Sequence, residues 1–156
     1  MSFHNNYNDW KKMTARENCP VCNRQPLPGG MVDVAELPSS WLNAESAECL
    51  QGACRLVAKQ HAIEVYELTD DELLGLMKDL KKCARALKNV TGAVKINYEI
   101  HGNTLPHLHI HLYPRYIDDP FPSRPIDFNQ KRADLYQEGE FASFVEEMRR
   151  ELAGGG

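Results

Sequence analysis

Apolar and polar residues alternate along several short stretches of the chain, and a period of two is typical of β-strands. The clearest case is the stretch 93–100, where Val94, Ile96, Tyr98 and Ile100 alternate with polar residues. This pattern predicts a strand with one buried face. Four other stretches are apolar, short and bounded by turn residues, and we expect them to be strands as well: 31–37, 40–45, 53–59 and 107–113.

The period changes to that of a helix after Thr69. Apolar residues recur three or four positions apart from Leu73 to Leu87, which predicts a long amphipathic helix. Thr69 and Glu72 form the capping-box pattern at its start. A second amphipathic helix is predicted at 140–152. Short strands with one central helix and a C-terminal helix predict an α+β fold with a mainly antiparallel, five-stranded sheet.

Composition narrows the class of protein. The chain has 156 residues and a formal net charge of −4, which argues against a protein that binds nucleic acid backbones. We find no apolar run of about 18 residues, and the first residues lack the apolar core of a secretory signal. We therefore expect a cytoplasmic protein with neither nucleic acid nor membrane as a partner. Its five cysteines are an odd number, which favours free thiols and a metal-binding pair over a disulfide framework.

Three histidines stand at every second position in PHLHIHLYPRY, residues 106–116. Alternate side chains of a strand share a face, so His107, His109 and His111 should lie together, opposite a face of aliphatic residues. Such a trio can bind zinc or iron, although a site that used all three would need a further ligand. A chance cluster on a solvated face is the other interpretation.

The wider stretch NYEIHGNTLPHLHIHLYPRY, residues 97–116, resembles the histidine triad (HIT) family of nucleotide hydrolases and transferases. The family's motif is His-φ-His-φ-His-φ-φ, where φ is apolar, and residues 107–113 match it with Tyr113 in the last place. Residues 58–73 look like the family's junction between a strand and a helix. The resemblance implies an enzyme that attacks the α-phosphate of a dinucleoside polyphosphate, a nucleoside phosphoramidate or a similar nucleotidyl ester.

The resemblance also implies that His107, His109 and His111 form the catalytic set, with a specific role for each of the last two. The middle one, His109, would attack the α-phosphorus and form a nucleotidyl-histidine that water hydrolyses. An imidazole suits this role because its ordinary pKa, near 6.5, leaves it neutral at pH 7. His111 would contact the phosphate or the bridging oxygen. Asn97, Asn103 and Thr104 match positions that hydrogen-bond the phosphate and the leaving group, although Asn103 and Thr104 also suit a plain turn and loop.

Cys19 and Cys22 form a Cys-x-x-Cys pair in a loop rich in proline. Such a pair can place two thiolates on one zinc ion, but zinc needs four ligands. A redox pair is the alternative, and that usually opens a helix in a βαβ unit. One branch of the family completes the site with two histidines, here His61 and His107. The resemblance thus implies a structural Zn²⁺ held by two sulfurs and two nitrogens, in which His107 would serve as a ligand.

Further expectations follow from the resemblance. The acid or amide that binds ribose in relatives falls near Glu45, for which an exposed loop glutamate is the alternative. Residues 19–118 would form the HIT-like catalytic domain, with 1–18 as an N-terminal extension and 119–156 as a proline-rich tail and C-terminal helix packed on the same domain. Relatives commonly form homodimers through the helix and an edge strand. A zinc-stabilised nucleotide-binding module that acts through a protein partner is the alternative function.

Overall fold

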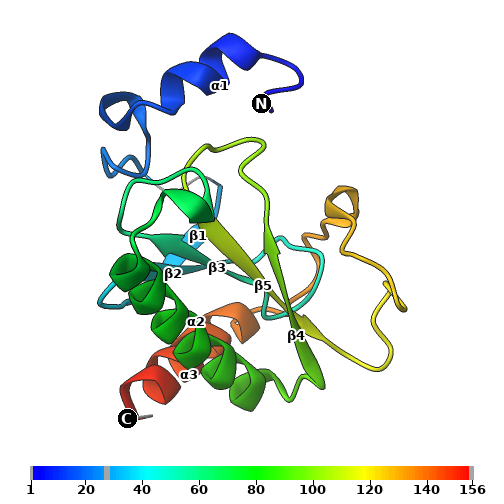
Figure 1. Ribbon diagram of the computed structural model, residues 1–156. Helices are drawn as coiled ribbons and strands as arrows, with labels where there is room; N and C mark the ends of the chain where they lie inside the picture. The colour runs from blue at the N-terminus through cyan, green and yellow to red at the C-terminus, as the bar shows by residue number, and fades with distance from the viewer. Residues whose placement is uncertain (1, 27–28, 155–156) are drawn as a thin grey trace.

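The centre of the protein is a five-stranded sheet in which all neighbouring strands are antiparallel (Figure 1). The computed structural model describes residues 2–26 and 29–154. The strands lie in the order β1-β2-β3-β5-β4. This sheet, with helices against it, is the α+β fold expected. The strands are β1 (Met31–Glu36), β2 (Ser40–Glu45), β3 (Cys54–Ala58), β4 (Lys95–Ile100) and β5 (His109–Arg115).

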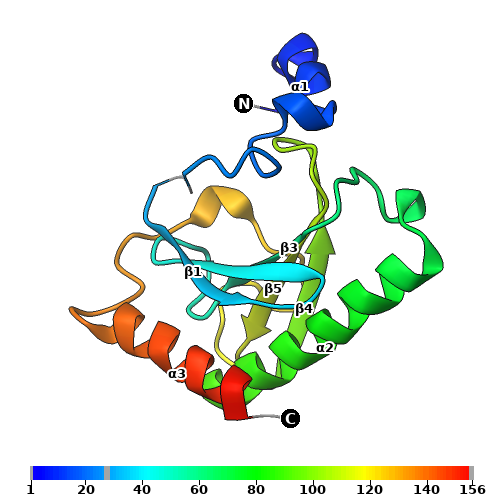
Figure 2. The ribbon, with the colours of Figure 1, turned by 90° about the vertical axis from the view of Figure 1, so that its left-hand side faces the viewer.

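Helices α2 (Asp70–Thr91) and α3 (Glu140–Gly154) lie side by side on one face of the sheet (Figure 2). Helix α2 begins at the predicted capping box, where Thr69 Oγ1 accepts from the Glu72 N–H and the Glu72 carboxylate accepts from the Thr69 N–H. The helix ends at Gly92, whose φ of 68° is left-handed. None of the helices in the described residues is both long and apolar enough to span a membrane.

The main core lies between the sheet and these two helices. Leu108, Ile110 and Leu112, the aliphatic residues between and after the histidines, are at most 1% exposed. This result confirms that one face of the histidine strand is apolar. On the opposite face a second, smaller cluster fills the space under the tail, and it consists of Cys49, Leu50, Ala53, Tyr113, Phe121 and Ile126.

The predicted buried face of residues 93–100 is wrong for three of its four apolar residues. Ile96 is buried, but Val94, Tyr98 and Ile100 are 58%, 50% and 46% exposed. The reason is that β4 lies at the edge of the sheet, where α2 covers only part of it. A shallow groove remains between α2 and β4, with apolar residues on its floor and basic residues around it. The alternation of apolar and polar residues therefore predicted the strand correctly, but it did not predict how much of its apolar face is buried.

The segment before β1 and the segment after β5 both form hydrogen bonds with the sheet domain. In the N-terminal extension, which contains α1 (Tyr7–Met13), the Trp10 indole N–H donates to Gly102 O at 2.9 Å. In the tail, Tyr136 Oη accepts from the Gly52 N–H at 2.6 Å. The proposed boundaries at residues 18 and 118 stay a prediction. Three short 3-10 turns complete the structure: η1 (Arg16–Asn18), η2 (Val65–Glu67) and η3 (Phe128–Gln130).

Candidate active site and metal cluster

The sheet face opposite the helices gathers the polar residues of the candidate site. Antiparallel pairing places Arg55 of β3 and Glu99 of β4 on either side of His111. The same register places Asn97 opposite Tyr113. Directly opposite residues point to the same face, so a guanidinium from β3 and a carboxylate and an amide from β4 flank the end of the histidine motif on β5.

His109 is held by a hydrogen bond that fixes which of its nitrogens carries the proton. Its Nδ1 lies 2.7 Å from the carbonyl oxygen of His107. Because a carbonyl can only accept, Nδ1 must carry the hydrogen, and the neutral ring then has its lone pair on Nε2. Burial lowers the pKa of His109 below its ordinary value of 6.5. His109 is therefore a neutral imidazole at pH 7 with an available Nε2.

His111 is packed among other rings on the same face. Its ring centroid lies 5.0 Å from that of His109 and 5.5 Å from that of Phe128, in both cases edge to face. The Tyr113 hydroxyl lies 3.3 Å from His111 Nδ1. Burial, and then repulsion from the protonated form of His109 and from the Arg55 guanidinium, lower the pKa of His111 to about 2. His111 is thus neutral as well, and it can donate a hydrogen bond but not act as a cation.

His107 forms a cluster with Cys19, Cys22 and His61. The candidate ligand atoms of the four residues all lie within 4.8 Å of one another. His107 Nδ1 is 3.3 Å from Cys19 Sγ, and His61 Nδ1 is 3.2 Å from Cys22 Sγ. The four residues that the family resemblance grouped are therefore brought together.

The hydrogen bonds of Nε2 in His61 and His107 leave both Nδ1 atoms able to bind a metal ion. His107 Nε2 lies 2.8 Å from Ala58 O, and His61 Nε2 lies 2.9 Å from Thr14 O. Each Nε2 must carry a hydrogen to bond a carbonyl, so each Nδ1 has a lone pair aimed at the sulfurs. Backbone acceptors behind metal-binding histidines orient the rings in this way. Both nitrogens of His107 are then engaged, which leaves its ring none for a substrate.

The predicted phosphate-binding residues occupy different surroundings. Asn97 is half-buried on β4, on the face of the histidines. Asn103 and Thr104 are exposed in the loop after β4. Asn103 O accepts from the Phe3 N–H at 2.9 Å, so the N-terminal segment is bonded to this loop. The structure therefore places Asn97 on the sheet and the other two at its margin.

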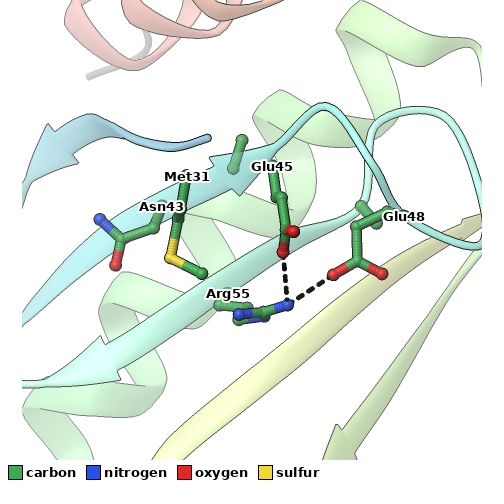
Figure 3. A pocket seen from close by; sticks show the side chains of 7 residues that line it. Met31, Asn43, Glu45, Glu48 and Arg55 are labelled. Carbon is green, nitrogen blue, oxygen red and sulfur yellow. Dashed lines mark hydrogen bonds and ion pairs between the residues drawn. The ribbon is translucent and has the colours of Figure 1, made fainter. Parts of the chain in front are cut away.

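Glu45, the predicted ribose contact, belongs to a cluster of ion pairs. Figure 3 shows the Arg55 guanidinium between Glu45 and Glu48, at distances of 2.9 Å and 2.6 Å from Nη2 to the carboxylate oxygens. Lys131 Nζ of the tail lies 3.1 Å from both carboxylates. The side chain of Glu45 is 17% exposed, which makes it a partly buried ion-pair residue rather than the exposed loop glutamate considered above.

Several residues of this face were assigned no function from the sequence, among them His101, Arg55, Tyr113 and Phe128. His101 lies 3.0 Å from the Glu99 carboxylate through Nε2, and its ring contacts those of His111 and Phe128. Arg55 could have been suspected as a cation in an otherwise apolar strand, and Tyr113 as a phenol in an apolar place of the motif. Phe128 comes from the tail, and its position depends on a loop path that no local pattern reveals.

Comparison with known proteins decides the family. The family model described as HIT domain matches residues 41–118, which is half of the chain. The chain belongs to the HIT family. A HIT-like protein of Methanocaldococcus jannaschii is 33% identical over an alignment of 73 residues, and the match covers 44% of this chain and 57% of that protein. The chain thus matches little more than half the length of this curated relative.

Solved HIT structures share the fold. A histidine triad protein of Bradyrhizobium japonicum superposes with a TM-score of 0.71 at 27% identity, over 79% of this chain and 91% of that one. A Zn-bound histidine triad family protein of Mycobacterium smegmatis has a TM-score of 0.63 at 16% identity, over 89% and 96%, and so shows the fold alone. Membership of the HIT family supports a function of the nucleotide-binding hydrolase or transferase type.

Proposed function

We propose that the protein hydrolyses or transfers nucleotidyl groups through a covalent intermediate on His109. The single observation that carries this proposal is the bond from His109 Nδ1–H to His107 O, because it leaves the Nε2 lone pair for nucleophilic attack. Burial keeps the ring neutral. Substrates of this class are dinucleoside polyphosphates and nucleoside phosphoramidates, as the resemblance implied.

The reaction has two steps. His109 Nε2 attacks the α-phosphorus, an N–P bond forms, and the bond to the leaving group breaks with its electron pair on that group, which takes up a proton from solvent when it leaves as an amine. Water then attacks the same phosphorus, an O–P bond forms, the N–P bond breaks with its pair returned to Nε2, and a proton goes to solvent. His111, Asn97, Asn103 and Thr104 would donate hydrogen bonds to phosphate oxygens, where donors are most effective as charge develops.

Turnover of an adenosine phosphoramidate tests this proposal. We expect release of the amine by the wild-type protein and at least a 10³-fold loss of rate in His109→Asn, because no second nucleophile replaces the imidazole. His4→Asn is the matched control, since His4 is exposed in the N-terminal segment, and it should keep the wild-type rate. Tight binding of the nucleotide without product would instead support the alternative, a binding module that acts through a protein partner.

The second part of the proposal is a structural Zn²⁺ held by Cys19, Cys22, His61 and His107. Two sulfurs and two nitrogens are a donor set that zinc prefers, and the Mycobacterium smegmatis protein that shares the fold is Zn-bound. The ion would join the N-terminal loop to the strand of the histidines. It would take no part in the reaction, because both ring nitrogens of His107 are engaged, one in the cluster and one with Ala58 O.

Elemental analysis tests the metal site. We expect one zinc per chain, and loss of zinc with lowered stability in Cys22→Ser. Cys49→Ser is the matched control, because Cys49 is a buried thiol outside the cluster. A purified protein that is folded without metal, or equal zinc in both variants, would refute the site.

The third part is a homodimer formed through β4 and α2. The exposed Tyr98 and Ile100 lie on the edge strand β4, and the exposed Val94 directly precedes it. Unpaired backbone groups of an edge strand can pair with another strand. We expect a dimer by analytical ultracentrifugation and a monomer for Val94→Asp. Ile117→Asp is the control, since Ile117 is 93% exposed outside the groove. A wild-type monomer at micromolar concentration would refute the dimer.

A cytoplasmic location without nucleic acid or membrane partners stays a prediction from composition. Fractionation of cells that express the protein would test the location.

A further inference from the structure

The last apolar position of the histidine triad motif is occupied by a tyrosine in this chain. Tyr113 follows His111 by two residues on β5, so both side chains point to the same face. Tyr113 is 0% exposed and packs against Phe121 and Ile126 of the tail. An apolar residue would fill this space equally well, so the hydroxyl group is the feature that needs an explanation.

The hydroxyl of Tyr113 lies 3.3 Å from His111 Nδ1. The two rings are nearly parallel, with an angle of 6° and centroids 5.8 Å apart. Within residues 2–26 and 29–154, no other hydrogen-bond partner of this hydroxyl is found. A buried O–H without an acceptor is unfavourable, so the phenol hydrogen must point to Nδ1. That nitrogen then accepts, and the neutral His111 ring carries its hydrogen on Nε2.

Neighbouring rings keep His111 in this orientation. His109 and Phe128 contact it edge to face at 5.0 Å and 5.5 Å. A turn of the imidazole by 180° would bring a carbon atom to the phenol hydroxyl and leave that hydroxyl unpaired. His111 Nε2 has no partner among the described residues, so its N–H is free to donate to a ligand.

We propose that Tyr113 is a positioning residue that selects the Nε2–H tautomer of His111, so that His111 donates a hydrogen bond to a phosphate oxygen. The catalytic part of this proposal rests on the proposed function. His111 keeps its proton throughout, and its N–H stabilises the negative charge that builds on oxygen while the bond from phosphorus to the leaving group breaks. Tyr113 itself touches no substrate.

Nuclear magnetic resonance tests the tautomer without any assay of activity. In ¹⁵N-labelled wild-type protein at pH 7, the His111 signals, identified by their absence from His111→Gln, should show a protonated Nε2 and an unprotonated Nδ1. In Tyr113→Phe, which keeps the ring and loses only the hydroxyl, the Nδ1–H form should become populated. An unchanged tautomer in Tyr113→Phe, or an Nδ1–H form in the wild type, would overturn the proposal.

Kinetics test the consequence for the reaction. Since the His111 donor acts mainly on the transition state, kcat of Tyr113→Phe should fall about tenfold, the equivalent of one hydrogen bond, while KM stays within about twofold. Tyr66→Phe is the matched control, because Tyr66 is 82% exposed, and it should match the wild type. An unchanged kcat with a shifted tautomer would overturn the catalytic part. A wild-type protein without turnover would instead defeat the proposed function, and the tautomer would still be decided by the spectra.

Discussion

Replacing Arg55 by methionine should destabilise the protein strongly, because it leaves a buried carboxylate without its main partner. Arg55 Nη2 lies 2.6 Å from Glu48 Oε1, and the side chain of Glu48 is only 4% exposed. The same nitrogen lies 2.9 Å from Glu45 Oε2. Methionine preserves most of the apolar stem of arginine, so the change removes chiefly the positive charge and its hydrogen bonds.

The magnitude follows from the burial of the partners. Removing one member of a buried ion pair costs about 3–5 kcal/mol. Lys131 Nζ remains 3.1 Å from Glu48 Oε1, but this lysine is 36% exposed, and a pair of that kind contributes up to about 1 kcal/mol. We therefore expect a loss of about 3 kcal/mol in the free energy of unfolding, or about 6–12 °C in Tm for a domain of this size.

Urea unfolding of Arg55→Met, Glu48→Gln and the double variant measures this energy. The double variant should lose less free energy of unfolding than the sum of the two single variants, by about 1–2 kcal/mol. The reason is that each single substitution leaves the other side chain without its ion-pair partner. Lys12→Met is the control, since its pair with Asp9 is 72% and 52% exposed, and it should leave stability unchanged. Additive losses, or an Arg55→Met protein as stable as the wild type, would show that the cluster does not depend on this ion pair.

Three other substitutions test separate features of the fold. Gly52 has a φ of +80°, and an added methyl group would lie 2.7 Å from a side-chain carbon of α2, so Gly52→Ala should cost about 3 kcal/mol of stability in urea. Gly139→Ala, at the same φ but with no atom within 4 Å, should cost clearly less. Arg115 holds the pKa of Asp119 below its ordinary value of 3.8, so stability should fall as pH drops below about 4, and Asp119→Asn should flatten that part of the curve. Thr69→Ala removes the N-cap of α2 and should cost about 1 kcal/mol in thermal unfolding.

The sequence predicted the features that depend on local pattern. Thr69 and Glu72 marked the start of α2 because a capping box needs only three residues of spacing. The burial of the apolar face of β4 could not be predicted from local pattern. Alternation shows that one face of a strand is apolar, but not whether a helix packs against that face. The contact of Phe128 with His111 could not be predicted either, since the tail has no periodicity and its path is set by distant bonds such as that between Tyr136 and Gly52.

The central claim is that His109 carries a covalent nucleotidyl group during turnover. The protein reacts with an adenosine phosphoramidate and is quenched rapidly without acid. Mass spectrometry of its peptides then measures this group directly. The account predicts one adenylyl group on the peptide that contains His109 and none in His109→Asn. Turnover without an adduct on the time scale of the first cycle, or an adduct on a different residue, would contradict it.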